Sequence, residues 1–143
     1  IFHRAERLME LQFSKEQSVA LANPFAACGI EVHVEQDLSV LPTGFDQIIV
    51  CTGFAPKVGL AKTAGLTINR GITVNGHLRK DDPNVYAVGD VAEVDGQLYP
   101  FIVPIRSQAR WLADYLMGKT VEPWTPPTFT PVVKIYGFKI IPA

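Results

Sequence analysis

A short, largely apolar run that ends in a glycine and a carboxylate is the pattern in this chain that could do chemistry. Residues 85–88 lead directly into Gly89 and Asp90. A buried strand that stops there puts the Asp90 carboxylate at the carboxyl edge of a sheet, where α/β folds bind ligands. Gly89 lets the backbone come close to a ligand because it has no Cβ. The carboxylate accepts hydrogen bonds from sugar-type hydroxyls.

A second run with the same shape lies earlier in the chain. Residues 48–51 are continuously apolar and are followed by Thr52 and Gly53. A continuous apolar run is typical of a strand that is covered on both faces. The two runs together predict an α/β fold in which ligand-binding turns follow parallel strands.

Local signals predict the elements of the first part of the chain. Ser14 and Gln17 have the spacing of a capping box, which predicts a helix from there to about Cys28, with Gly29 as its left-handed stop. Pro24 lies inside this range and predicts a kink. The helix carries two apolar rows, Val19, Ala22 and Ala26 beside Leu21, Phe25 and Cys28. Residues 30–34 alternate apolar and polar, which predicts a half-buried strand.

In the second part of the chain, glycine and proline residues mark the ends of the predicted elements. Residues 60–65 predict a short helix that ends at a glycine, and Asn75-Gly76 after the short run Ile72-Thr73-Val74 predicts a hairpin. Pro104 predicts the start of a helix that runs to about Met117 and stops at Gly118. The tail from residue 121 is proline-rich and predicts an extended linker, followed by two short strands at residues 132–136 and 138–141.

Composition excludes several classes of function. The chain has 143 residues, a size typical of one domain, and a net charge of −1. This charge gives no electrostatic footprint for nucleic acid or an acidic membrane surface. No apolar run approaches the roughly 20 residues that span a bilayer. The chain begins at Ile1, without a methionine, which is compatible with a piece of a longer protein.

Cysteine, histidine and serine residues predict no site of their own. Cys28 and Cys51 form no Cys-x-x-Cys pair and lie among apolar residues, so we expect reduced core residues in a cytoplasmic protein. The three histidines are dispersed and have no spaced cysteine or aspartate partners, which predicts no metal site. Ser14 and Ser107 have no histidine and aspartate arranged around them, so nucleophilic catalysis is not supported.

The order of elements resembles a known family. A strand that ends at Thr52-Gly53, the run 87–90, and a proline-led helix with Gln108-Ala109 resemble the carboxyl-terminal portion of FAD/NAD(P)-dependent pyridine nucleotide oxidoreductases. These are flavoproteins with two dinucleotide-binding domains. Residues 65–75 are most similar to rubredoxin or flavorubredoxin reductases and to the flavoprotein domains of nitrite reductases.

The resemblance implies an incomplete copy of this α/β fold. Residues 1–53 would form the second half of the NAD(P)-binding domain. Residues 54–120 would form the return segment of the FAD domain, and residues 121–143 the start of the carboxyl-terminal interface domain.

The resemblance also implies a site and its cofactors, FAD and NAD(P)H. Asp90 would bind the flavin ribityl chain, Gly89 would allow close approach, and Thr52-Gly53 would mark the crossover between the domains. The helix after Pro104 would direct free backbone N–H groups at the flavin pyrimidine, from Ile105, Arg106 and Ser107. Hydride would pass between the cofactors and electrons to a small redox protein such as rubredoxin, so no catalytic side chain is required.

The first residues carry a specificity signal. Family members end the corresponding strand in an acidic residue that binds the ribose of NAD, whereas this chain has His3 followed by Arg4. Cations in place of the acid suit a 2′-phosphate, which predicts a preference for NADPH. The alternative is that Arg4 and Arg7 are simply part of a solvated face.

Departures from the family keep other interpretations open. None of the eleven glycines forms a Gly-x-Gly pair, so no phosphate cradle is present. Lys80 stands where the family usually has threonine, and Cys51 where it has alanine. The chain alone should bind FAD weakly or not at all. It could instead be a cofactor-free interaction or scaffold module, or a small nucleotide-binding protein of different topology. Unpaired apolar edges predict an oligomer, or a partner chain that supplies the missing amino-terminal portion.

Overall fold

The computed structural model describes residues 1–129, 133–135 and 138–140. The chain divides into two compact units, the first built from residues 1–50 and the described part of 130–143, the second from residues 51–129. The fold class is mixed α/β, as predicted. Among the described residues, no helix has the length and apolar character needed to cross a membrane.

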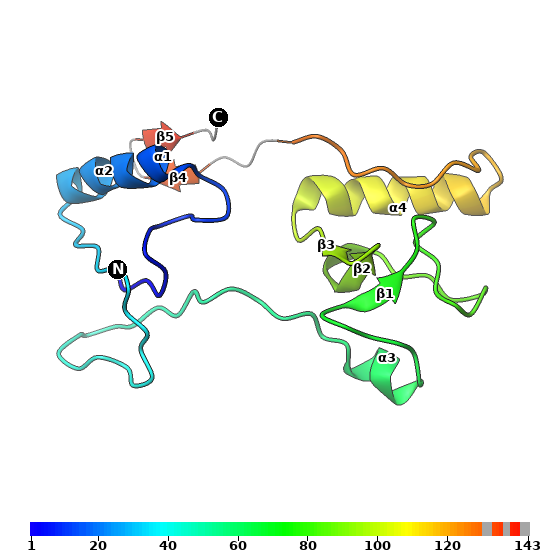
Figure 1. The fold of residues 1–143 in the computed structure, drawn as a ribbon, viewed down its shortest axis with the longest axis horizontal. Coiled ribbons are helices and arrows are strands. Elements are labelled where there is room, and N and C mark those ends of the chain that lie inside the picture. The colour runs from blue at the N-terminus through cyan, green and yellow to red at the C-terminus, as the bar shows by residue number, and fades with distance from the viewer. Residues whose placement is uncertain (130–132, 136–137, 141–143) are drawn as a thin grey trace. The chain divides into compact units, whose positions relative to one another are not determined.

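The first unit begins with two short helices in place of the single kinked one that was predicted (Figure 1). Helix α1 spans Lys15–Ala20 and helix α2 spans Ala22–Ala27. The capping box is confirmed, because the Gln17 N–H donates to Ser14 Oγ at 3.3 Å and the Ser14 N–H donates to Gln17 Oε1 at 3.0 Å. The break falls at Leu21. Pro24 explains it, since its ring lacks an N–H and crowds the carbonyl one turn earlier.

The two predicted apolar rows on these helices are buried only in part. Leu21 is buried together with Ser18 and with Phe13 from the preceding loop, whereas Val19 is 65% exposed. Cys28 and Cys51 are both exposed, so their prediction as core residues is wrong. Gly29 has a φ of 69°, which confirms the left-handed stop.

Strand pairing in the first unit is sparse. The predicted strand 30–34 is reduced to one parallel bridge between Phe2 and His33, although Val32 and Val34 are half-buried and their neighbours exposed, as the alternation predicts. The strands β4 (Val133–Ile135) and β5 (Phe138–Ile140) pair in antiparallel register. They confirm the predicted strand pair; residues 132, 136 and 141 of that prediction lie outside the described residues.

The apolar run 48–51 does not form the buried strand that was predicted. Ile49 is 85% exposed and Val50 63%, in irregular backbone. A β-strand exists only where a neighbour completes its hydrogen-bond ladder. Within the described part of the chain, no backbone hydrogen bond outside helices and strands is made by residues 48–51.

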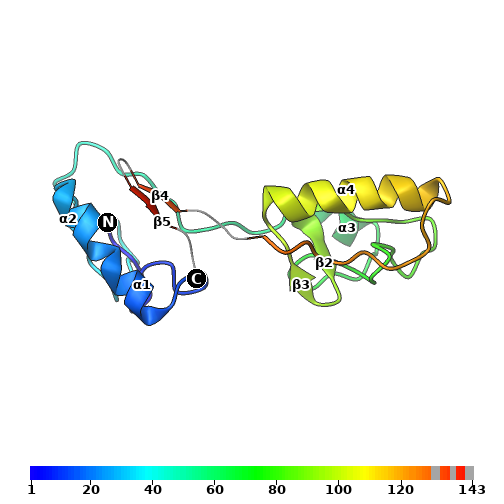
Figure 2. The same ribbon diagram turned by 90° about the horizontal axis from the view of Figure 1, so that it is seen from above.

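The second unit holds a small three-stranded sheet with a long helix beside it. Helix α3 (Gly59–Thr63) comes first and stops before Gly65, as predicted. Strands β1 (Ile72–Val74), β2 (Ala92–Val94) and β3 (Gln97–Leu98) lie in the order β1-β2-β3. Helix α4 (Ile102–Leu116) lies beside β2 in both views (Figures 1 and 2).

The hairpin of this sheet lies at a different turn from the predicted one. Asn75 does make a turn, because its Oδ1 accepts from the N–H groups of His77 at 2.9 Å and Arg79 at 3.1 Å. However, β1 pairs in parallel with β2 rather than with the segment that follows the turn. The antiparallel hairpin joins β2 to β3 across Asp95 and Gly96, whose φ angles are 47° and 82°. Two successive positive φ angles suit the Asp-Gly turns that close tight hairpins.

A buried carboxylate fastens the turn that precedes β1. Glu93 is 2% exposed, and its two oxygens accept from the Gly71 N–H and from Asn69 Nδ2, both at 2.7 Å. The hydrogen bond from the Gly71 backbone, with the smaller contribution of Asn69, holds the pKa of Glu93 below its usual range. The carboxylate thus links β2 to the chain that enters β1.

The core of the second unit reaches into the proline-rich tail. Trp124 is 5% exposed and packs with residues of the sheet and its turns, namely Val74, Leu78, Ala87, Ala92 and Val94. Its backbone N–H donates to the Gly76 carbonyl at 2.8 Å, and its indole Nε1 donates to Ser107 Oγ at 3.0 Å. The tail as far as residue 129 is therefore packed onto this unit.

Candidate functional site

The turn at Gly89 and Asp90 is built by a sharp change of backbone direction. Val88 is extended, Gly89 has a φ of 83°, and residues Gly89–Val91 form the single 3-10 turn η1. Any other residue type would be strained at this φ. A Cβ built on Gly89 would meet nothing within 4 Å. The glycine therefore leaves open space at the turn.

The Asp90 side chain is exposed on this turn. No hydrogen bond or ion pair to its carboxylate is found among the described residues. The turn itself is held from helix α4, where Gln108 Oε1 accepts from the Gly89 N–H at 2.7 Å. A carboxylate with open space around it and a fixed backbone behind it can accept hydrogen bonds from a hydroxylated ligand.

Helix α4 begins earlier than predicted, which moves its free backbone donors. Its N-cap is Phe101 and Pro104 is its third residue. The N–H of Ile105 donates to the Phe101 carbonyl at 3.1 Å, so it is already part of the helix. The N–H groups left without a helical partner at such an end are those of Ile102 and Val103, because proline has none.

The free donors predicted on Ile105, Arg106 and Ser107 are therefore wrong in position. Helical geometry pairs the N–H groups of Arg106 and Ser107 with carbonyls one turn earlier. Arg106 is exposed and Ile105 is half-buried. Ser107 is engaged through its hydroxyl, which accepts from Trp124 Nε1.

Thr52 and Gly53 lie in irregular backbone that leads toward α3, and both are exposed. Gly53 has a φ of 97°, and a Cβ there would meet nothing within 4 Å. Among the described residues, no hydrogen bond joins either of them to the turn at Gly89. The strand predicted to end at Thr52-Gly53 is absent, and the structure does not link these two residues to Asp90.

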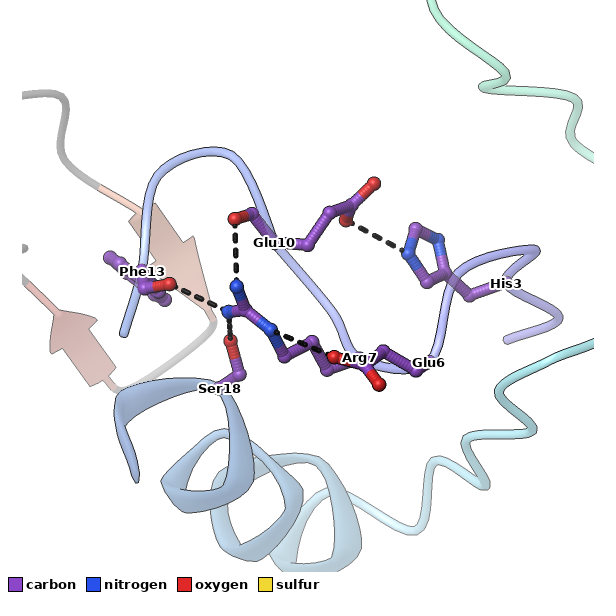
Figure 3. Close-up of polar contacts among 6 residues, drawn as sticks. All are labelled: His3, Glu6, Arg7, Glu10, Phe13 and Ser18. Carbon is purple, nitrogen blue, oxygen red and sulfur yellow. Dashed lines mark hydrogen bonds and ion pairs between the residues drawn. The ribbon is translucent and has the colours of Figure 1, made fainter. Parts of the chain in front are cut away.

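His3 and Arg4 belong to the first unit. His3 Nε2 lies 3.2 Å from Glu10 Oε2 (Figure 3). Arg4 is exposed and makes no ion pair with any described residue. A backbone hydrogen bond at Glu10 and, more weakly, the His3 imidazole hold the pKa of Glu10 below its usual range. A carboxylate that sequence analysis did not single out thus stands beside the predicted nucleotide position.

Arg7 is not part of a solvated face. Its guanidinium donates to the Phe13 carbonyl at 2.6 Å, to Ser18 Oγ at 3.0 Å and to the Glu10 carbonyl at 3.0 Å (Figure 3). It ties the loop before α1 to the helix, which leaves Arg4 as the exposed cation of this segment.

A polar hollow of about 400 Å³ opens on another part of the second unit. Its lining includes Thr67, Thr73, Arg79, Lys80 and Asp81. The Lys80 side chain is nearly buried, with Nζ 2.9 Å from Thr73 Oγ1 and 3.2 Å from Asp81 Oδ2. None of these residues was predicted as a site. Among the described residues, no group of three histidine, cysteine, aspartate or glutamate side chains is arranged to hold a metal ion.

The chain is similar to several known proteins. The Nitric oxide reductase FlRd-NAD(+) reductase of Citrobacter koseri is 44% identical over 92 residues, which cover 64% of this chain and 24% of the relative. The NADH:rubredoxin oxidoreductase of Clostridium acetobutylicum has a TM-score of 0.77 at 23% identity, covering 99% of this chain and 38% of that one. The NAD-dependent persulfide reductase of A. fulgidus has a TM-score of 0.85 at 22% identity, covering 98% and 30%.

These matches confirm the resemblance and the fold. The solved structures share the fold over part of their length, and the chain spans about a quarter of the length of the Citrobacter koseri relative. The sequence profile described as pyridine nucleotide-disulphide oxidoreductase matches residues 1–110. The chain belongs to the pyridine nucleotide-disulphide oxidoreductase family.

Proposed function

We propose that this chain is part of a flavoprotein oxidoreductase that passes hydride from NAD(P)H to FAD and electrons on to a small redox protein such as a rubredoxin. The observation that carries the proposal is the exposed Asp90 carboxylate on the glycine turn, free of any partner among the described residues. The relatives support it, since one is named a FlRd-NAD(+) reductase and another an NADH:rubredoxin oxidoreductase.

The residues at the turn fit a flavin nucleotide. Gly89 leaves room for the ligand, and the Asp90 carboxylate suits the hydroxyls of the ribityl chain. For the flavin pyrimidine we assign the N–H groups of Ile102 and Val103 in place of those first predicted on residues 105–107. We retain Thr52-Gly53 as the crossover segment. Bound FAD would supply the acceptor of hydride, and the chain would supply position and electrostatics.

We further propose that residues 1–53 belong to a nucleotide domain and residues 54–120 to a flavin domain. The packing of Trp124 on the sheet core argues that the flavin segment extends to residue 129. For the nucleotide, His3 and the exposed Arg4 support NADPH, while Glu10 beside His3 opposes a 2′-phosphate. The proposed preference therefore rests on Arg4.

A second candidate is a cofactor-free interaction module. It is favoured by the exposed apolar residues outside the core, among them Ile49 at 85% and Leu60 at 86%. Such surfaces are typical of contacts with another chain. The two candidates differ in one observable property, which is the binding of flavin.

The test is a chimaera in which this chain replaces the matching portion of the Citrobacter koseri relative. The flavin proposal predicts a yellow protein that holds close to one FAD per chain and oxidises NAD(P)H with a redox-protein acceptor. Asp90→Asn should lower the FAD content, whereas Asp95→Asn should not, since Asp95 is an exposed turn residue elsewhere in the unit. A folded chimaera without flavin would favour the interaction module.

A further inference from the structure

Gln108 is the most deeply buried polar side chain of helix α4. It is 0% exposed, and its Oε1 accepts from the Gly89 N–H at 2.7 Å. Its Nε2 is also buried and has no hydrogen-bond partner among the described residues. The side chain is thus held by one polar contact, and that contact is made to the turn that carries Asp90.

The hydrogen bond replaces a cap that the local sequence lacks. Gly89 is the first residue of η1, and the residue before it, Val88, offers no side-chain acceptor for the free N–H groups of a helical start. The amide oxygen of Gln108 takes this role from another element. Because the Gly89 N–H can only donate, the amide must turn its oxygen toward the turn and its nitrogen away. The orientation of Gln108 is therefore fixed.

Asp90 depends on this arrangement for its position. Its carboxylate makes no hydrogen bond or ion pair among the described residues, so the backbone of η1 alone determines where it lies. Within the same residues, the bond from Gly89 to Gln108 is the side-chain hydrogen bond that joins η1 to another element. One change at residue 108 therefore removes this hydrogen bond without touching Asp90.

We infer that Gln108 is a positioning residue for the flavin, which fixes the Gly89–Val91 turn against α4 so that the Asp90 carboxylate and the first turn of α4 face the ligand together. The inference rests on the proposed function, because it assigns the purpose of a hydrogen bond at the proposed flavin site.

The first measurement needs no flavin. In the 143-residue chain, amide hydrogen exchange and the amide proton shift of Gly89 are compared by NMR for Gln108→Met, Gln108→Glu and the wild type. Methionine has a similar length but no acceptor, so Gly89 should exchange roughly tenfold faster, as expected for the loss of one hydrogen bond. Glutamate has nearly the same shape and keeps an oxygen acceptor, and burial favours its uncharged, protonated form, so it should restore protection. Gln97→Met, at an exposed position in β3, is the matched control.

The second measurement uses the chimaera and FAD. Gln108→Met should weaken FAD binding roughly tenfold and alter the visible circular dichroism of the flavin that remains, and Gln108→Glu should recover both. A purely structural role would lower the amount of folded protein but leave that spectrum unchanged. If the methionine variant fails to fold, Gln108→Asn, which shortens the side chain and keeps the amide, should give an intermediate loss.

The outcomes distinguish a failure of the role of Gln108 from a failure of the proposed flavin site. Unchanged FAD affinity and spectrum in Gln108→Met, together with weakened binding in Asp90→Asn, would overturn the role of Gln108 and leave the flavin site standing. Unchanged FAD binding in both variants would overturn the flavin site itself. Unaltered protection of the Gly89 amide in Gln108→Met would overturn the hydrogen bond on which the inference depends.

Discussion

At the scale of single residues, buried and exposed carboxylates have opposite roles in this chain. Glu93 is buried, and its two carboxylate oxygens accept hydrogen bonds from the Gly71 N–H and from Asn69 Nδ2. Asp90 is exposed and has no partner among the described residues. A buried charge is tolerated only when it is fully hydrogen-bonded, so Glu93 is part of the scaffold. A carboxylate left with open acceptors on a fixed turn is available to a ligand.

Glu93 gives a pH-dependent prediction. Its pKa in the folded chain lies below the usual 4.5, mainly because of the Gly71 N–H. Its stabilisation is therefore fully present above the unfolded pKa and is lost as the pH falls through the folded value. Glu93→Gln, which leaves one of the two donors without an acceptor, should lower the free energy of unfolding at pH 7 by about 2 kcal/mol.

Urea denaturation at several pH values measures this effect. The difference between wild type and Glu93→Gln should shrink as the pH falls below the usual glutamate pKa of 4.5. Glu122→Gln, an exposed glutamate with no side-chain partner among the described residues, should leave stability within about 0.5 kcal/mol. A constant difference between pH 7 and pH 3 would show that the charge of Glu93 contributes nothing.

Arg4 gives a prediction about nucleotide choice. Because His3 is paired with Glu10 and Arg7 is tied to the loop before α1, the proposed contact with a 2′-phosphate rests on Arg4. Arg4→Glu in the chimaera should lower kcat/KM with NADPH roughly tenfold and leave kcat/KM with NADH within about twofold. Lys57→Glu serves as an exposed charge-reversal control. Equal loss with both nucleotides would remove the specificity role.

At the scale of elements, the parallel pairing of β1 with β2 depends on a glycine. A Cβ on Gly71 would lie 2.6 Å from the Val91 carbonyl oxygen and 3.1 Å from Glu93 Cβ. Gly71→Ala should therefore destabilise the second unit by about 2 kcal/mol. Gly59→Ala is the matched control, since a Cβ at the start of α3 meets nothing within 4 Å. Equal thermal midpoints for the two variants would contradict this packing.

Signals confined to a few residues predicted local structure well. The capping box at Ser14, the stops at Gly29 and Gly65 and the end of α4 at Gly118 are all present. Each of these depends on the φ angle or hydrogen bonds of its own turn. The carboxylate of Asp90 also lies on a glycine turn, as predicted, but the strand predicted before it at residues 85–88 is reduced to one antiparallel bridge between Arg79 and Tyr86.

Pairing and burial were predicted less well because they depend on distant partners. Residues 48–51 read as a buried strand, yet burial requires neighbouring strands that the described residues do not supply. The hairpin was expected at Asn75, but β1 found a parallel partner in β2, while the Asp95-Gly96 turn signal was overlooked. At the candidate site, α4 starts at Ile102, so its free backbone N–H groups lie earlier in the chain than predicted. The hydrogen bond from the Gly89 N–H to Gln108 joins residues far apart in the sequence, so no local pattern indicates it.

At the scale of the whole molecule, exposed apolar surface predicts association. We expect concentration-dependent self-association of the chain in sedimentation velocity, driven in part by the exposed apolar run 48–51. Ile49→Lys should weaken it by placing a charge on that run. Leu11→Lys is the matched control, because both side chains are 85% exposed. A monodisperse monomer at all concentrations would contradict the expectation, and equal effects of the two variants would exclude the run as its cause.

The most direct test of the proposed flavin site is a thermodynamic cycle in the chimaera. The dissociation constants of FAD and of an FAD analogue lacking one ribityl hydroxyl are measured for the wild type and for Asp90→Asn. If the carboxylate receives that hydroxyl, Asp90→Asn should weaken FAD binding roughly tenfold and the analogue little. Equal effects of Asp90→Asn on FAD and on every ribityl analogue would contradict a contact between Asp90 and the flavin.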